Sequence, residues 1–213
     1  MTQQQDPTAG LVMSYLGLRR AVGVVAVLLP FLLLGGKLLI DGPGVPGSVS
    51  AFYYTSMRNV LVGLLFMQGT FLLSYRYDRR DTIAAVIAGV AVIGVALFPT
   101  QPANPTPTDV AIGVIHLICA GTFFLTTAYF SLFLFTLSDG HPTRRKLQRN
   151  VVYRVAGVVI LVCLVLQVVT DNLLPRAVVD AVHPVFWLES LAIIAFGVSW
   201  LVKGETVLRD DAV

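Results

Sequence analysis

Six continuous apolar segments run through this chain, and each is long enough to cross a lipid bilayer as a helix. An α-helix rises about 1.5 Å per residue, so about 20 apolar residues cover a hydrocarbon layer of about 30 Å. Only 13% of the residues are Asp, Glu, Lys or Arg, whereas a soluble domain carries about 25%. We therefore predict an all-α polytopic membrane protein, a bundle of six transmembrane helices. The expected spans are residues 21–40, 57–75, 82–98, 110–137, 151–170 and 185–202.

Three segments carry further structural information. The span at 110–137 has 28 residues and would measure about 42 Å as a helix, which exceeds the hydrocarbon thickness. It must tilt, project or bend, and Gly121 or the neighbouring Thr126 and Thr127 mark the expected bend. The span at 82–98 is rich in Ala and Gly, which predicts a central helix that its neighbours approach closely. Residues 174–182, in the last outer loop, predict a short surface helix.

Lysine and arginine residues lie mostly on one side of the predicted spans, and this bias orients the bundle. With the N-terminus inside, 12 of the 15 lie at cytoplasmic edges and 3 lie on the other side. Because cytoplasmic loops carry the excess of positive charge, both termini are expected in the cytoplasm. The residues assigned to the cytoplasmic edges are Arg19, Arg20, Arg76, Arg79, Arg80, Arg144, Arg145, Lys146, Arg149, Arg154, Lys203 and Arg209.

One domain accounts for the chain. We expect a disordered cytoplasmic N-terminus at residues 1–17, the transmembrane domain at 18–204 and a short cytoplasmic tail at 205–213. The basic loops and the lack of glycosylation sequons favour a plasma membrane, specifically the bacterial inner membrane. The net charge of +3 is small and spread over the membrane edges, so no nucleic-acid partner is expected. The expected partners are membrane lipids, another membrane subunit or a second copy of the chain.

Polar side chains gather at one depth in the outer half of the predicted bundle. Spans two, four and six all start at the outer face, and each carries an ionisable residue within one or two turns of it. Charged groups inside spans are costly, so they tend to face the bundle interior or a cavity. We therefore predict a pocket that opens to the outer side. Its candidate lining residues are Arg58, His116 and Glu189, with Asp109, Tyr53 and Tyr54 nearer its mouth.

Each of these residues also has a purely structural interpretation. Arg58 and Glu189 would neutralise each other as an ion pair, and we expect them within salt-bridge distance. His116 would be a hydrogen-bonded packing residue, and Asp109 after a threonine would cap a helix. The two tyrosines would anchor the chain at the membrane interface.

Three functions remain open on the sequence alone. The first is a membrane protein whose outer-half pocket binds a lipid headgroup, a small ligand or a partner subunit. The second is a metal-assisted or acid–base hydrolase acting on a lipid through His116, Glu189 and Asp109, and the third is a small transporter. No HExxH, P-loop or GxSxG motif occurs, so we predict no cofactor and no metal site.

Four stretches carry a resemblance to a known family. They are SVSAFYYTSMRNVLVG at 48–63, SYRYDRRD at 74–81, ALFPT at 96–100 and FWLES at 186–190. On these stretches the chain resembles bacterial six-transmembrane proteins of the DUF998 type and is more distantly similar to Frag1/DRAM-like proteins. The resemblance implies six helices and supplies no reaction.

Overall fold

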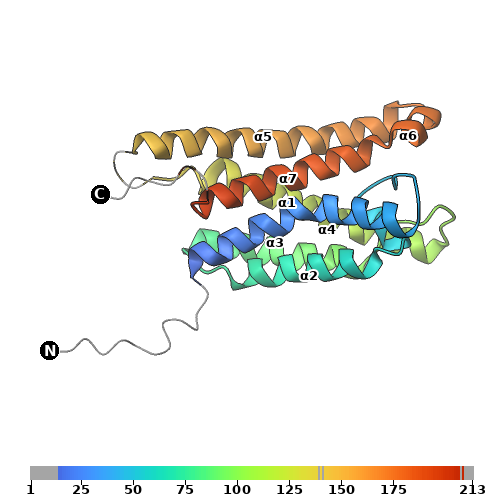
Figure 1. Cartoon of the computed structure of the whole chain (residues 1–213), viewed down its shortest axis with the longest axis horizontal. Coiled ribbons are helices and arrows are strands. Elements are labelled where there is room, and N and C mark those ends of the chain that lie inside the picture. Colours follow the sequence, from blue (N-terminus) through green and yellow to red (C-terminus); the bar gives the residue numbers. More distant parts are fainter. Residues whose placement is uncertain (1–13, 139, 141, 207, 209–213) are drawn as a thin grey trace.

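A computed structural model describes residues 14–138, 140, 142–206 and 208, and every regular element in that part of the chain is a helix (Figure 1). Six of these helices are long, and three are short. The elements are α1 (Tyr15–Ile40), the 3-10 helix η1 (Ser50–Tyr54), α2 (Arg58–Ser74), α3 (Arg79–Leu97), α4 (Pro107–Tyr129), the π-helical segment η2 (Phe130–Leu134), α5 (Arg144–Leu173), α6 (Arg176–Val182) and α7 (Pro184–Lys203).

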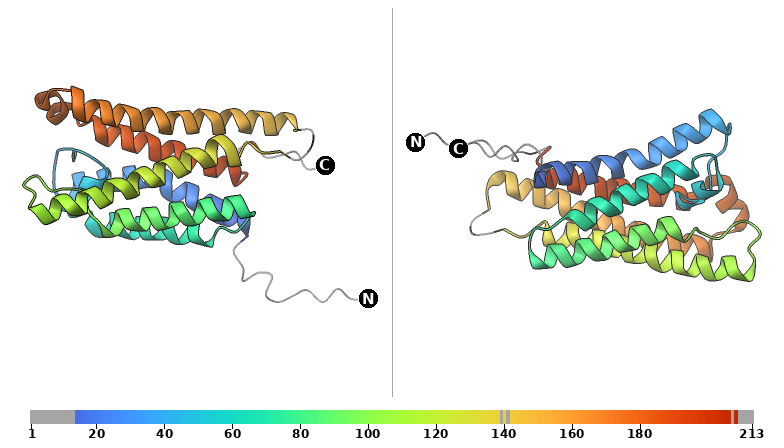
Figure 2. Two further views of the ribbon diagram at one scale, coloured as in Figure 1. Left: turned by 180° about the vertical axis from the view of Figure 1, so that it is seen from behind. Right: turned by 90° about the horizontal axis from the view of Figure 1, so that it is seen from below.

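The long helices run alternately in opposite directions along one bundle axis (Figures 1 and 2). Helix α7 packs against both α1 and α5, and α3 packs between α2 and α4. The bundle therefore has two distinct ends. The basic end holds the starts of α1, α3 and α5 and the ends of α2, η2 and α7, whereas the η1 end holds η1 and α6.

The outside of the bundle is apolar. Five helical segments are long and apolar enough to cross a membrane, namely α1, α3, α4 with η2, α5 and α7, and α2 is a shorter apolar helix of 17 residues. Large apolar side chains point away from the protein along these helices, for example Leu117, which is 71% exposed, and Val165, which is 63% exposed. Such a surface suits lipid and not water. The chain is a multi-pass membrane protein.

Glycine pairs bring the helices into close contact. A Cβ atom on Gly23 of α1 would lie 2.8 Å from the Gly197 oxygen of α7, and a Cβ atom on Gly197 would lie 2.8 Å from the Gly23 oxygen. Gly69 of α2 and Gly89 of α3 face each other in the same way, with 3.1 Å in both directions. The buried face of α3 consists mainly of Ala and Gly. The predicted close approach of neighbouring helices at this span is confirmed for α2 and α4, although α3 also exposes large side chains such as Val90 and does not lie at the centre of the bundle.

The fourth long run contains an irregularity that relates to the expected bend. The segment from Phe130 to Leu134 is π-helical, and the Phe135 N–H donates to the Phe130 oxygen at 2.8 Å, five residues back. It begins one turn after Thr126, whose oxygen shares the Phe130 N–H with the oxygen of Thr127. The irregularity therefore lies close to the second of the two expected positions, and Gly121 lies within regular α-helix.

Helix ends differ from the predicted spans where polar residues extend a helix beyond its apolar run. Helix α1 begins at Tyr15 and not at 21, because the Ser14 hydroxyl accepts from the Gly17 N–H at 3.1 Å and caps it. Helix α6 confirms the predicted surface helix. The expected disorder at residues 15–17 is wrong, because they form the first turn of α1. Residues 1–13 of that segment lie outside the described residues, and so does most of the expected tail, at 207 and 209–213.

Candidate functional site

Glu189 of α7 caps the start of η1. Its Oε2 atom accepts a hydrogen bond from the Val49 N–H at 2.6 Å. Val49 is the N-cap residue of η1 and has no side-chain acceptor of its own for the free N–H groups there. A carboxylate is a favourable partner at a helix N-terminus, because the unpaired N–H groups carry partial positive charge. Glu189 therefore ties η1 to α7.

His116 of α4 holds η1 from the other side. Its Nδ1 atom lies 2.7 Å from the Phe98 oxygen, and its Nε2 atom lies 3.0 Å from the Ser50 Oγ. Because Ser50 directly follows Val49, two adjacent residues of the η1 end join His116 to Glu189. The side chain is buried, with only 6% of it exposed. The histidine faces the protein interior and not the lipid.

The prediction that Arg58 and Glu189 form an ion pair is wrong. Both residues belong to the described part of the chain, and no ion pair joins them there. Arg58 is exposed, its Nε donates to the Tyr53 oxygen at 2.7 Å, and its guanidinium lies 4.4 Å from the centre of the Tyr53 ring. The reason is η1 itself, whose backbone supplies an acceptor for the arginine and N–H donors for the glutamate.

The two remaining candidates have structural partners. Asp109 forms a capping box at the start of α4, because its Oδ2 accepts from the Thr106 N–H at 2.8 Å while the Thr106 hydroxyl accepts from the Asp109 N–H at 3.3 Å. This is the helix-cap interpretation given above. The Tyr54 hydroxyl donates to the Thr100 oxygen and links η1 to the loop before α4.

Two small cavities flank η1. One of about 50 Å³ is bordered by Glu189, Ser50 and otherwise apolar side chains such as Phe123. The other, of about 10 Å³, is bordered by His116 and Tyr53. Neither has room for a lipid headgroup. Arg58, Asp109 and Tyr54 border neither cavity, so the structure brings only three of the six candidates to an internal space.

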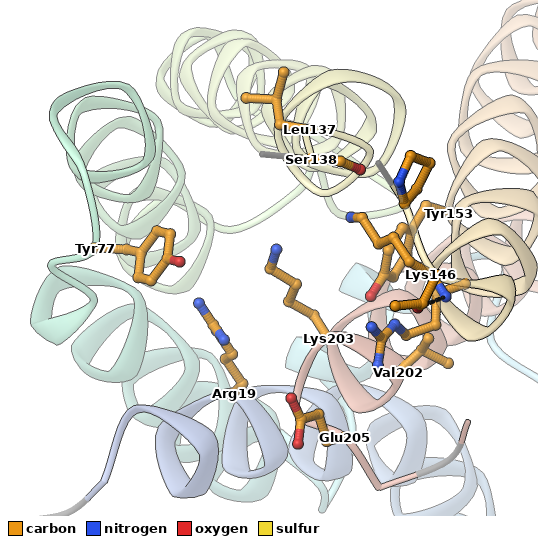
Figure 3. Close-up of a pocket in the computed structure, with 12 residues that line it drawn as sticks. Arg19, Tyr77, Leu137, Ser138, Lys146, Tyr153, Val202, Lys203 and Glu205 are labelled. Atoms are coloured by element: carbon orange, nitrogen blue, oxygen red, sulfur yellow. Dashed lines mark hydrogen bonds between the residues drawn. The ribbon is translucent and has the colours of Figure 1, made fainter. Parts of the chain in front are cut away.

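A much larger pocket lies at the basic end. It has a volume of about 390 Å³ and is formed where α1, α5 and α7 meet the α2–α3 loop and the segment after η2 (Figure 3). Four of its side chains are cationic and one is anionic. The lining residues are Arg19, Tyr77, Leu137, Ser138, Pro142, Thr143, Lys146, Arg149, Tyr153, Val202, Lys203 and Glu205.

Arg19 is held in a fixed position at this pocket. Its Nε and Nη2 atoms donate to the Tyr75 hydroxyl at 3.3 and 3.0 Å, and that hydroxyl donates to Asp81 Oδ1 at 3.4 Å. The guanidinium also lies 4.8 Å from the centre of the Tyr77 ring. An ordinary phenol is neutral near pH 7, so the hydroxyl orients the arginine without cancelling its charge. Arg19 is thereby preorganised before any ligand arrives.

Lys203 reaches into the same pocket from the last turn of α7 (Figure 3). Its Nζ atom lies 5.3 Å from the centre of the Phe135 ring and 6.0 Å from that of Tyr77. Within the described residues, no atom accepts a hydrogen bond from this ammonium and no carboxylate forms an ion pair with it. Aromatic rings attract a cation only modestly, so the lysine keeps N–H donors that an anion can accept.

The opposite wall of the pocket comes from α5. Lys146 donates through Nζ to the Phe135 oxygen at 2.7 Å, and Arg149 donates through Nη1 to the Leu208 oxygen at 3.2 Å. In Figure 3, Lys146 and Tyr153 lie across the pocket from Arg19 and Tyr77. Cations from three helices therefore surround one space.

The pocket is not among the sequence predictions, because membrane orientation alone accounts for the same cations. The signal that points to it is the position of Arg19 and Lys203 inside the ends of apolar helices, with the alternating tyrosines Tyr75 and Tyr77 in the loop beside them. Loop charges that only orient a protein have no need of aromatic neighbours.

The fold and the pocket together define a class: a multi-pass α-helical membrane protein with a basic pocket at one end of its bundle. None of the family models, curated proteins and solved structures compared with the chain matches it. The function must therefore be argued from the geometry.

Proposed function

We propose that this chain is a six-span protein of the bacterial plasma membrane, with both termini in the cytoplasm, that binds an anionic ligand in its basic pocket. The orientation rests on charge: eleven described Lys and Arg residues lie at the basic end, and three lie at the other. With the basic end inside, α2 supplies the sixth span, and the pocket opens to the cytoplasm or the inner leaflet. The proposal includes a relationship to DUF998-type proteins, based on the sequence resemblance described above.

The observation that carries the proposal is the ammonium of Lys203. It is partly buried, it points into the pocket, and no described residue accepts a hydrogen bond from it. A buried charge is costly unless a counter-charge or hydrogen bonds compensate it. Arg19 is a second cation beside it, and the neutral Tyr75 hydroxyl orients that cation without removing its charge. A bound anion would satisfy both groups at once.

Thermal unfolding of the purified protein in detergent tests this function. We expect inorganic phosphate, added at constant ionic strength, to raise the melting temperature of the wild-type protein. A ligand present at 100 times its dissociation constant stabilises the folded state by about 2.7 kcal/mol. Lys203→Gln should lose most of this rise, because it removes the cation that lacks a partner.

Arg79→Gln is the matched control. Arg79 lies at the same end of the bundle and is exposed, but it does not border the pocket. Arg79→Gln removes the same unit of charge as Lys203→Gln. Because it leaves the pocket unchanged, it should keep the phosphate response of the wild-type protein. Equal phosphate responses of the two variants would contradict the proposal, and so would a wild-type protein that responds to neither phosphate nor the phosphate esters and lipids described below.

The η1 end supports a second candidate function, the binding of a small ligand in the outer half. The observation in its favour is that Glu189, Ser50 and His116 border cavities that apolar side chains otherwise enclose. Mass spectrometry of small molecules and lipids extracted from purified protein tests it. A species that is retained by the wild-type protein and lost from folded His116→Ala would support it, and identical extracts would reject it. The hydrolase and transporter alternatives stay predictions.

A further inference from the structure

The N–H groups left free in the basic pocket indicate the shape of the anion. Arg19 donates through Nε and Nη2 to Tyr75, and within the described residues neither its Nη1 group nor Lys203 Nζ makes a hydrogen bond. An arginine Nη carries two N–H groups and a lysine ammonium carries three. A carboxylate has two oxygens to place among these donors, a phosphate monoester has three, and a phosphate diester has two together with its ester oxygens. Arginine as a fork and lysine as a point charge are the usual phosphate-binding groups.

Glu205 adds a requirement of the opposite sign. It lies in the turn after α7 with a φ of 55°, and its side chain borders the pocket. Within the described residues, its carboxylate neither accepts a hydrogen bond nor forms an ion pair. A ligand that is anionic throughout would be repelled by this group. A ligand with a hydroxyl or ammonium group near its phosphate would satisfy it.

The remaining walls suit a carbon skeleton. Tyr77, Leu137, Pro142 and Val202 contribute apolar surface beside the charged groups. The volume of about 390 Å³ also exceeds what a bare ion needs, since one water molecule occupies about 30 Å³ in the liquid. The pocket therefore has room for an organic group attached to the anion.

From these three features we infer that the ligand of the basic pocket is a phosphate ester carrying a hydroxyl or ammonium donor beside its phosphate. Arg19 and Lys203 bind the phosphate, Glu205 accepts from the donor, and the apolar wall covers the carbon chain. Glycerol phosphate and ethanolamine phosphate have this chemistry, either as soluble esters or as headgroups of inner-leaflet lipids. The inference rests on the proposed function, because it names the anion that the pocket takes.

Soluble esters test the inference on the full-length protein in detergent. Ethanolamine phosphate and glycerol 3-phosphate carry the donor, and ethyl phosphate has a similar size without it. We expect the wild-type protein to bind the first two at least tenfold more tightly than ethyl phosphate, as measured by thermal unfolding over a concentration series. Glu205→Ala should reduce this preference to less than threefold, and Lys203→Gln should weaken all three esters.

The outcomes separate the two proposals. If ethyl phosphate binds through Lys203 as tightly as the donor-bearing esters, the inference is wrong and the anion-binding function stands. If no ester and no inorganic phosphate stabilises the wild-type protein in detergent, and the lipid comparison below also shows no effect, both are wrong. Arg79→Gln should behave as the wild-type protein with all three esters.

Nanodiscs distinguish the two sources of the ester. The protein is placed in phosphatidylcholine, whose headgroup ammonium has no N–H donor, and in the same lipid with added phosphatidylethanolamine. A higher melting temperature with phosphatidylethanolamine, lost in Lys203→Gln and Glu205→Ala, identifies a lipid headgroup. A response to the soluble esters alone identifies a cytoplasmic ligand. If the melting temperature changes neither with phosphatidylethanolamine nor with the soluble esters, the inference is wrong.

Discussion

Individual residues at the η1 end are stabilised by the protein backbone more than by each other. Glu189 and Arg58 carry opposite charges, yet each is bound by main-chain groups of the segment around η1. The sequence places these residues at one depth, because depth follows from counting along each span. It does not show that Ser50–Tyr54 folds as a 3-10 helix between them, because the pairing depends on where that short loop segment packs.

The roles of Glu189 and Arg58 predict unequal effects of substitution. Glu189→Ala leaves the buried Val49 N–H without its acceptor, which costs about 1–3 kcal/mol. Arg58→Ala removes an exposed contact with Tyr53 that contributes at most about 1 kcal/mol. The two effects should add in the double variant within about 0.5 kcal/mol, since the side chains share no hydrogen-bond partner. Thermal unfolding of the three variants in detergent measures these effects. A coupling free energy between the two substitutions above about 1.5 kcal/mol would show that Arg58 and Glu189 do interact as an ion pair.

At the level of helices, backbone contact between glycines determines which neighbours meet. The apolar runs predict that helices form, because hydrophobicity is a property of each segment alone. They do not specify that α7 lies between α1 and α5, because a helix face rich in Val and Leu is equally compatible with lipid and with any neighbouring apolar helix. The Gly23–Gly197 contact supplies that information, because it brings α1 and α7 close enough for their main chains to touch.

Two glycine substitutions should therefore change the stability of the protein in opposite directions. Gly197→Ala places a Cβ atom 2.8 Å from the Gly23 oxygen and 2.9 Å from the Val27 nitrogen, both main-chain atoms that cannot turn aside. We expect a loss of about 1–3 kcal/mol, typical of overpacked sites. Gly121→Ala meets no atom within 4 Å and should stabilise α4 by about 0.5–1 kcal/mol. Melting temperatures in detergent check both, and a stabilised Gly197→Ala would disprove the close contact.

For the whole molecule, the distribution of charge underlies both the proposed orientation and the basic pocket. The prediction of membrane class and of six apolar helices could be made from the sequence, because each depends on local composition. The pocket could not, because Arg19, Lys146 and Lys203 are separated by more than 50 residues from one another and meet only when α1, α5 and α7 pack. Positive charge at membrane edges is so common that the sequence alone does not show which of these cations meet.

Cysteine labelling in intact cells tests the orientation. In a background with Cys119 and Cys163 replaced by serine, we expect Ala103→Cys, in the loop before α4, to react with a membrane-impermeant maleimide. Arg145→Cys, at the start of α5, should react only after the membrane is permeabilised. The reverse pattern would place the basic pocket on the outside and would exclude a cytoplasmic ligand.

The π-helical segment η2 places one more residue between two aromatic contacts than a regular α-helix would. Phe130 and Phe135 both lie against Trp200, with ring centres 5.4 and 5.2 Å away. Residues five apart in a regular α-helix differ by roughly 140° around the axis, so only the wider turn lets both rings meet one indole. Deleting a single residue between them would let the segment revert to α-helix with the two phenylalanines four residues apart, a difference of roughly 40° around the axis, so both rings could still face Trp200. A one-codon deletion within η2 should therefore be tolerated better than a one-codon deletion in the regular turns of α4, which would rotate every side chain beyond it by roughly 100°.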